Sequence, residues 1–268
     1  MKHRMQCKTH FLTSGFTLVE MSIVLVIIGL VIGGIITGKT LIRSANVKAI
    51  ISDYQTYQSA INAFTLKFDA LPGDMPNASD IWGAADGGDG LGADCYNVDS
   101  TGNTSTCNGN GNLVIGGLPF LHETFRAWQH LANAELIAGS FSGRSGPGGG
   151  NHAVENFNSP SSSLTNSGFS FKSISGVWGD ANWFQNRYEN MIVYGRYSTT
   201  EWETLGRILT GSETWLIDKK IDDGYPAKGK IWAFHWSLCT TASSNTDYSA
   251  EYNITTTENS CALLFFSL

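Results

Sequence analysis

Hydrophobic residues follow two distinct patterns near the start of this 268-residue chain. The first is a continuous apolar run from Phe16 to Gly38, whose 23 residues include one ionisable side chain, Glu20, and no proline. At about 1.5 Å per residue this run predicts a helix of roughly 34 Å, long enough to cross the hydrocarbon core of a bilayer. A carboxylate near the start of such a span is costly unless it is paired, so Glu20 requires a partner.

The second pattern is a helical stripe that continues from the apolar run. Its residues recur at steps of four and three: Ile50, Tyr54, Tyr57, Ile61, Phe64 and Phe68. This is the spacing of one face of a helix, and Pro72 and Gly73 predict that the helix ends near Asp69. We therefore expect one helix that begins in the membrane, continues as an amphipathic segment over 39–68, and ends under a globular head of residues 69–268.

A basic leader precedes the apolar run, and the junction between them carries a specific motif. The leader, residues 1–15, has no acidic residue and contains Lys2, Arg4 and Lys8. The junction reads GFTLVE from Gly15 to Glu20, and this order resembles the processing signal of type IV pilins and type II secretion pseudopilins. The resemblance implies that a prepilin peptidase cuts after Gly15 and N-methylates Phe16, and that Glu20 pairs with the freed amine of a neighbouring subunit. An ordinary signal anchor that happens to contain a glutamate is the alternative.

The same resemblance implies a fold, a location and further partners. The expected fold is α+β, with a long N-terminal α-helix, its first half in the membrane, packed against an antiparallel, β-rich, disulfide-bonded head. The implied partners are the lipid bilayer, other pilin or pseudopilin subunits and an inner-membrane assembly machinery. Because the leader is basic, the positive-inside rule places the head in the periplasm until the subunit enters a filament. A pilus and a secretion pseudopilus use the same signal, although the proline-free span favours a pseudopilin or a minor subunit.

Charge and cysteine content describe the head more closely. The chain has a net charge of −6, and loss of the basic leader makes the remainder more acidic, which argues against nucleic acid as a partner. Cys7 lies in the leader, so the mature chain keeps four cysteines: Cys95, Cys107, Cys239 and Cys261. An even number outside the membrane predicts two disulfides. Three pairings are possible, and we favour Cys95–Cys107 and Cys239–Cys261, because each pair brackets a local polar loop.

Two acidic segments are candidate Ca²⁺ sites, since this ion takes six to eight oxygen ligands. The loop 84–112 places four aspartates among glycines and asparagines: Asp86, Asp89, Asp94 and Asp99. Its spacing is not that of an EF-hand, so a solvated, disulfide-bound loop is the alternative. The run 217–226, which resembles a segment of prepilin-like proteins, contributes Asp218, Asp222 and Asp223. Here the simpler interpretation is a helix end whose acids pair with Lys219, Lys220 or backbone donors.

The remaining elements of the head are predicted from local signals. A turn that follows the long helix in prepilin-like proteins resembles Leu71-Pro72-Gly73-Asp74. A second helix is predicted over Pro119–Ala138, with Trp128 in the core and Gly139 as its stop. His122 and His130 read as ordinary surface or hydrogen-bonded residues. Residues 139–168 are predicted as loop, and Thr210–Glu213 has the pattern of a capping box that opens a short helix ending at Gly224. Strands are predicted at Val177–Trp178, around Met191–Tyr197, at Gly229–Leu238 and at Ala262–Phe266.

Catalytic motifs are absent from the sequence, which has no His-Glu-x-x-His, Gly-x-Ser-x-Gly or Walker loop. We therefore predict that the protein is not an enzyme but the substrate of one, and that it serves as a structural filament subunit. The main alternative is a filament-borne adhesin or binding module, in which aromatic loops contact a surface, sugar or nucleic acid through Trp178, Trp183, Phe184 and Trp202. A membrane-anchored hydrolase is a third possibility.

Overall fold

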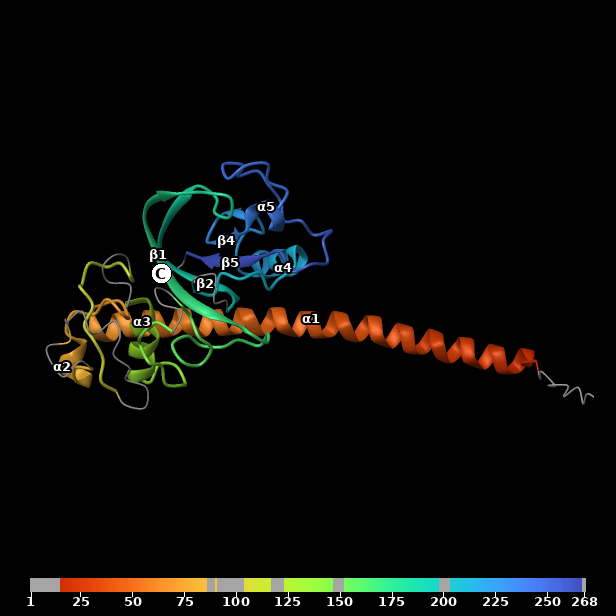
Figure 1. Ribbon diagram of the computed structural model, residues 1–268, viewed down its shortest axis with the longest axis horizontal. Coiled ribbons are helices and arrows are strands. Elements are labelled where there is room, and N and C mark those ends of the chain that lie inside the picture. Colours follow the sequence, from red (N-terminus) through yellow and green to blue (C-terminus); the bar gives the residue numbers. More distant parts are fainter. Residues whose placement is uncertain are drawn as a thin grey trace, which may run out of the picture. The chain divides into compact units, whose positions relative to one another are not determined.

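The computed structural model describes residues 15–85, 90, 104–116, 123–146, 152–197 and 203–266. The chain forms two compact units, one up to Ser44 and one from Ala45 onward. A 51-residue helix, α1 (Leu18–Phe68), supplies residues to both units (Figure 1). It ends where the Pro72-Gly73 signal predicts, because Asp69 already has a positive φ of 51°.

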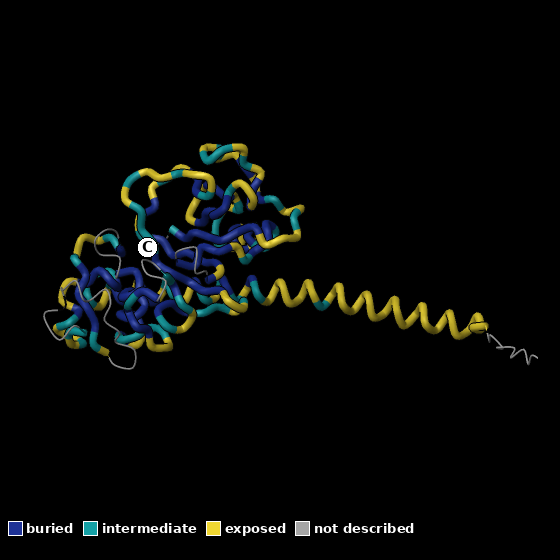
Figure 2. The backbone as a smooth tube through the Cα atoms, in the orientation of Figure 1, coloured by how far each residue is buried: buried dark blue, intermediate teal, exposed yellow. Residues whose placement is uncertain are grey.

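The part of α1 from Ala45 onward buries the predicted stripe. Ile50, Tyr54, Ile61 and Phe64 are at most 2% exposed, and Tyr57 and Phe68 are partly buried against the same core. Figure 2 shows this change along α1, from an exposed first half to a second half that is buried on one side. The helical periodicity of the sequence is therefore confirmed as a packing surface for the head.

A five-stranded antiparallel sheet with the strand order β1-β2-β5-β4-β3 forms the centre of the head. The strands are β1 (Ser167–Trp178), β2 (Asn186–Arg196), β3 (Ala227–Lys228), β4 (Ile231–Phe234) and β5 (Ala262–Phe265). Together with α1 this sheet confirms the predicted α+β class. Strand β5 pairs with both β2 and β4, so it lies inside the sheet.

Both faces of the sheet are buried, because alternate residues of each strand point to opposite sides. One face packs with α1 and α3 and includes Phe169, Phe171, Ile192, Tyr194, Ile231, Leu263 and Phe265. The other face forms a second core with Trp183 and Phe184, and includes Tyr188, Met191, Val193, Trp232, Phe234 and Leu264. Tyr54 of α1 stacks on Phe265 with ring centroids 4.2 Å apart, which ties the helix to the first face.

Four shorter helices complete the described part of the head: α2 (Ala78–Trp82), α3 (Glu123–Asn133), α4 (Gly211–Ile221) and α5 (Trp236–Cys239). The predicted capping box opens α4, since the Thr210 side chain accepts the N–H of Glu213 and the Glu213 side chain accepts the N–H of Thr210. Trp128 of α3 is fully buried, as predicted for a core residue. It lies edge-on to Tyr57 and 4.5 Å from the ring of Phe171.

Several predicted boundaries differ from those of the structure. The strand predicted at Val177–Trp178 is the end of β1, which begins at Ser167, inside the loop predicted over 139–168. Polar serines interrupt the alternation of apolar residues in the first part of β1. In the structure Ser170 is buried, and its hydroxyl group lies 2.8 Å from that of Thr204. The strand predicted over Gly229–Leu238 ends at Phe234, because His235 adopts a left-handed conformation that starts α5. Helix α3 ends at Asn133 rather than near Ala138.

The cysteines agree with the favoured pairing as far as the structure describes them. Cys239 and Cys261 form a disulfide, with Cα atoms 4.9 Å apart, which joins the end of α5 to the start of β5. Closing a loop of this size stabilises a domain by about 3 kcal/mol. Cys107 is also disulfide-bonded and fully buried. Its predicted partner, Cys95, lies outside the described residues.

Candidate functional site

The motif that resembles a processing signal lies at the start of α1. Gly15 and Phe16 precede the helix, and the side chain of Phe16 is 80% exposed. Apart from its chain neighbours, no described atom lies within 4 Å of where a Cβ on Gly15 would be. Packing among the described residues therefore leaves room for a side chain at this position.

Thr17 and Glu20 form a capping box that the sequence analysis did not identify. The Glu20 carboxylate accepts hydrogen bonds from the backbone N–H and the hydroxyl of Thr17, at 2.8 and 2.7 Å. In return, the backbone N–H of Glu20 donates to the Thr17 hydroxyl at 3.2 Å. The Thr-x-x-Glu spacing is the same signal that predicted the cap at Thr210. The only ionisable side chain of the apolar run therefore sits where the helix begins, with its carboxylate partly satisfied.

The surface of the first half of α1 is almost wholly apolar. Its 18-residue window of highest hydropathy has a mean of 2.7 and is 0% buried, which makes it long and apolar enough to cross a membrane. Two of its hydroxyl groups turn back onto the helix: Ser22 donates to the carbonyl of Val19 and Thr37 to that of Gly33. Such internal bonds suit an environment that offers no water.

The second acidic segment comes together in space as a compact group. Asp218, Asp222 and Asp223 each place a carboxylate oxygen within 4.8 Å of the others. Asp218 is fully buried, and its two oxygens accept from the N–H of Gly224 and the hydroxyl of Tyr252. Burial raises the pKa of Asp218 to about 7.

The other two acids of this group also accept backbone hydrogen bonds. Asp222 accepts from the N–H groups of Lys230 and Ile231, and Asp223 from that of Tyr225. The ammonium group of Lys219 lies over the Trp215 ring, 4.6 Å from its centroid. The arrangement is that of a helix end closed by backbone donors.

The aspartates of the first acidic segment, Asp86, Asp89, Asp94 and Asp99, lie outside the described residues, as do His122 and Trp202.

Two buried carboxylates organise the loop 110–116, and only one of them stood out in the sequence. Asp74, within the predicted turn, accepts from the N–H groups of Gly111, Asn112 and Leu113 at 2.7 to 3.1 Å. Glu123, at the start of α3, accepts from those of Asn110 and Gly116. These contacts join segments 37 to 39 residues apart for Asp74, so no local pattern could have shown them.

His130 is buried in the same region, and the expectation that it is a hydrogen-bonded residue is confirmed. Its Nδ1 accepts the N–H of Gly73 at 3.0 Å, which leaves Nε2 as the donor to Thr106 or the carbonyl of Cys107. The imidazole therefore holds the turn after α1 against the 104–116 loop. Its role is structural.

Glu123 predicts an unusual pH dependence of stability. Burial raises its pKa to about 7 against a normal 4.5, although hydrogen bonds from Gly116 and Asn110 oppose this shift. The Glu123 carboxyl group then binds a proton more readily in the folded state than in the unfolded state. Its contribution to the stability of the fold is therefore fully present below about pH 4.5 and is lost as the pH rises through 7. We expect the free energy of unfolding to contain a term of about 2 to 3 kcal/mol that disappears between these limits.

Comparing variants isolates this term from other titrations, such as that of His235. Glu123→Gln should reduce the slope of the unfolding free energy against pH between 4.5 and 8, measured by chemical denaturation, and the remaining slope comes from groups such as Asp218, whose pKa burial also raises to about 7. Glu135→Gln, at an exposed carboxylate shortly after α3, is the matched control and should retain the wild-type slope. Parallel curves for Glu123→Gln and the wild type would contradict the assignment.

In comparisons with known proteins, no family model, curated protein or solved structure matches this chain.

Proposed function

We propose that this protein is a structural subunit of a type IV pilus-like or type II secretion pseudopilus filament. In this proposal a prepilin peptidase cuts after Gly15, Phe16 becomes the methylated N-terminus, and α1 anchors the subunit in the inner membrane with the head in the periplasm. Extraction into a filament then exchanges lipid contacts of α1 for contacts with other subunits. The protein is itself a substrate and performs no catalysis.

The observation that carries the proposal is the exposed apolar half of α1, with a single carboxylate at its beginning. Leu18, Leu25 and Leu30 are each more than two-thirds exposed, and their neighbours are exposed as well. An apolar surface of this extent needs lipid or protein around it. The amine that cleavage would create lies four residues before Glu20, so each subunit would offer one positive and one negative group at the same depth in the membrane. Alternating pairs between neighbours would satisfy both.

The head supports the same proposal. A helix that continues from the apolar segment and packs against one face of an antiparallel sheet is compatible with a pilin fold, and so is the disulfide of the head. The exposed first half is left available to neighbouring copies.

The test is mass spectrometry of the N-terminus from cells with and without a prepilin peptidase. With the peptidase, the wild-type chain should begin at methylated Phe16, whereas Gly15→Ala should reduce the processed fraction by about tenfold or more. Gly29→Ala is the matched control, because neither position has a described atom near the added Cβ, and it should be processed normally. A leader that stays on the wild-type chain in both strains would refute the proposal.

A further inference from the structure

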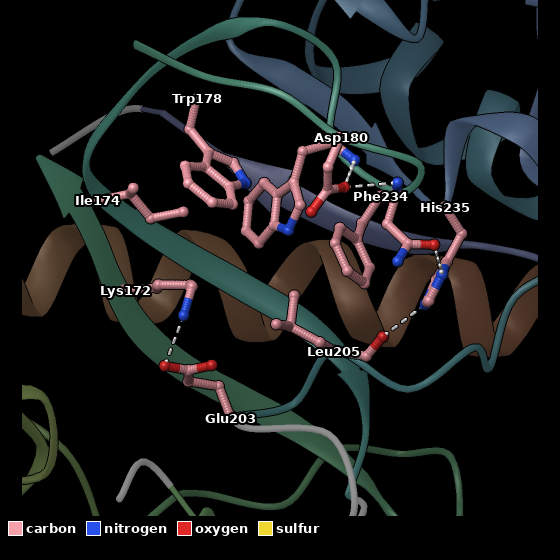
Figure 3. A pocket seen from close by; sticks show the side chains of 10 residues that line it. Lys172, Ile174, Trp178, Asp180, Glu203, Leu205, Phe234 and His235 are labelled. Carbon is pink, nitrogen blue, oxygen red and sulfur yellow. Dashed lines mark hydrogen bonds and ion pairs between the residues drawn. The ribbon is translucent and has the colours of Figure 1, made fainter. Parts of the chain in front are cut away.

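A cavity of about 390 Å³ opens on the face of the sheet that does not contact α1 (Figure 3). Its volume is in the range of sites for small organic molecules. Five apolar residues line the cavity. Ile174 and Trp178 belong to β1, Phe234 belongs to β4, and Trp183 and Leu205 lie in the segments after β1 and after β2. The polar lining is Lys172, Asp180, Asn182, Glu203 and His235.

The loop between β1 and β2, which carries one wall of the cavity, is held in place from several directions. The Asp180 carboxylate accepts the N–H groups of Asn182 and Trp183 at 2.7 and 3.1 Å. The backbone carbonyl of Asp180 accepts the indole N–H of Trp236, and that of Asn182 accepts the N–H of His235. Preorganisation of this kind lowers the entropic cost of binding a ligand.

The protonation of His235 follows from its surroundings. Its Nε2 lies 2.9 Å from the carbonyl oxygen of Leu205, which can only accept, so Nε2 carries a hydrogen. Burial lowers the pKa of His235 to about 4, which disfavours a charged ring at pH 7. The side-chain amide of Asn182 lies beside the ring, with its oxygen 3.0 Å from Nδ1.

The charges of the lining disfavour both anions and cations. Lys172 and Glu203 pair at 2.8 Å, with side chains 13% and 1% exposed, so their charges balance. Asp180 adds a further carboxylate at the rim, which repels anionic ligands. The ammonium of Lys172 lies 5.9 Å from the ring centre of Trp183, so the position that a cation would take over this indole is already filled. A neutral ligand with its own hydrogen-bonding groups is the remaining class.

The aromatic wall indicates the shape of that ligand. Trp178 is 47% exposed, a large apolar area for a side chain at the end of a strand. An indole at the mouth of a cavity offers a flat face to the C–H groups of a saturated ring, while carboxylate and amide groups beside it form hydrogen bonds with hydroxyl groups at the edge of that ring. Pyranose sugars have both features.

We infer that this cavity binds a neutral pyranose sugar, with Trp178 stacked on the ring, the Asp180 carboxylate accepting hydrogen bonds from its hydroxyl groups, and the Asn182 NH₂ group donating to them. The Lys172–Glu203 pair offers further donors and acceptors at the opposite side. The inference does not depend on filament assembly, because all of these residues belong to the head. For a single sugar unit we expect a dissociation constant on the order of 1 mM.

The experiment uses the full chain in a polyoxyethylene-ether detergent, which carries neither a sugar nor an ammonium group. Methyl glucoside, methyl galactoside, methyl mannoside and N-acetylglucosamine are titrated separately, with binding followed by saturation-transfer NMR and tryptophan fluorescence. At least one sugar should bind. Trp178→Ala should weaken it about tenfold, and Asp180→Asn several-fold, because each removes a direct contact. Trp178→Phe should retain most of the affinity.

Tyr225→Ala is the matched control, since Tyr225 is 42% exposed but lies outside this cavity, and it should leave sugar affinity unchanged. Near-ultraviolet circular dichroism of each variant checks that the head is folded. The inference is overturned if no sugar binds at 50-fold the expected constant, roughly 50 mM. It is also overturned if Trp178→Ala and Tyr225→Ala weaken binding equally, or if choline binds at this site in preference to every sugar.

Discussion

Glu20→Leu is expected to reduce filament assembly by about tenfold or more while leaving membrane insertion intact. The substitution removes the one ionisable side chain of the apolar run, so insertion becomes easier. In the proposed filament, however, the amine of a neighbouring Phe16 would lose its counter-charge within the apolar interior. An unpaired charge there costs at least about 2 kcal/mol, which corresponds to more than a tenfold loss.

The capping box at the start of α1 offers a second explanation for such a loss, and two variants separate the explanations. Glu20→Gln keeps a side chain that can cap the helix but removes the charge. Thr17→Val keeps the charge but removes the hydroxyl that bonds with Glu20, at a cost of about 1 kcal/mol at the helix start. If charge pairing controls assembly, Glu20→Gln should fail nearly as completely as Glu20→Leu, and Thr17→Val should assemble.

The measurement is the ratio of filament-borne to membrane-inserted subunit in cells that express the assembly machinery. Processing of each variant is checked by N-terminal mass spectrometry, so that a failure to be cleaved is not mistaken for a failure to assemble. Normal assembly of Glu20→Gln together with failure of Thr17→Val would mean that Glu20 acts as a helix cap alone.

Trp128→Ala is expected to lower the free energy of unfolding of the head by about 3 to 5 kcal/mol. The indole is fully buried where α3 meets α1 and β1, in contact with the rings of Tyr57 and Phe171. Its removal leaves a cavity that three separate elements would have to move to fill. Since domains of this kind are stable by about 5 to 15 kcal/mol, the loss is a large part of the total.

Two further substitutions give the scale for this result. Trp128→Phe should cost much less, about 1 kcal/mol, because it fills most of the space and removes an indole N–H that has no hydrogen-bond partner among the described residues. Trp178→Ala, at a half-exposed tryptophan, should also cost about 1 kcal/mol or less. Chemical denaturation followed by near-ultraviolet circular dichroism measures all three. Equal losses for Trp128→Ala and Trp178→Ala would show that the junction of α1, α3 and β1 is not the centre of stability.

Local signals predicted the elements whose physics is local. The stripe from Ile50 to Phe68 follows from helical spacing alone, and the start of α4 follows from the reciprocal bonds of Thr210 and Glu213. The sequence has the same Thr-x-x-Glu pattern at Thr17 and Glu20, where it overlaps the motif that resembles a processing signal.

Sheet boundaries were harder to predict, because strand ends depend on what lies across the fold. In β1, serine and glycine obscure the alternation of Phe169 and Phe171, and the buried Ser170 forms its hydrogen bonds with the distant Thr204. At the end of β4, an apolar sequence that alternates like a strand is turned into α5 at His235. That residue is bonded to Asn182 and to the carbonyl of Leu205, neither of which is near it in sequence.

The sequence by itself determined the long helix and its apolar and amphipathic halves, since these depend on residues close together along the chain. The α+β class was implied by a family resemblance, and Cys239–Cys261 belonged to the favoured one of three possible pairings. Only the tertiary structure decided the rest. It brought Asp74 to a loop almost forty residues away, and it gathered Lys172, Trp178, Glu203 and Phe234 around one cavity. Buried polar groups form hydrogen bonds with whichever groups the fold brings near them, and a cavity forms where packed elements leave space between them. Neither depends on the spacing of residues along the chain, so no periodic pattern in the sequence predicts them.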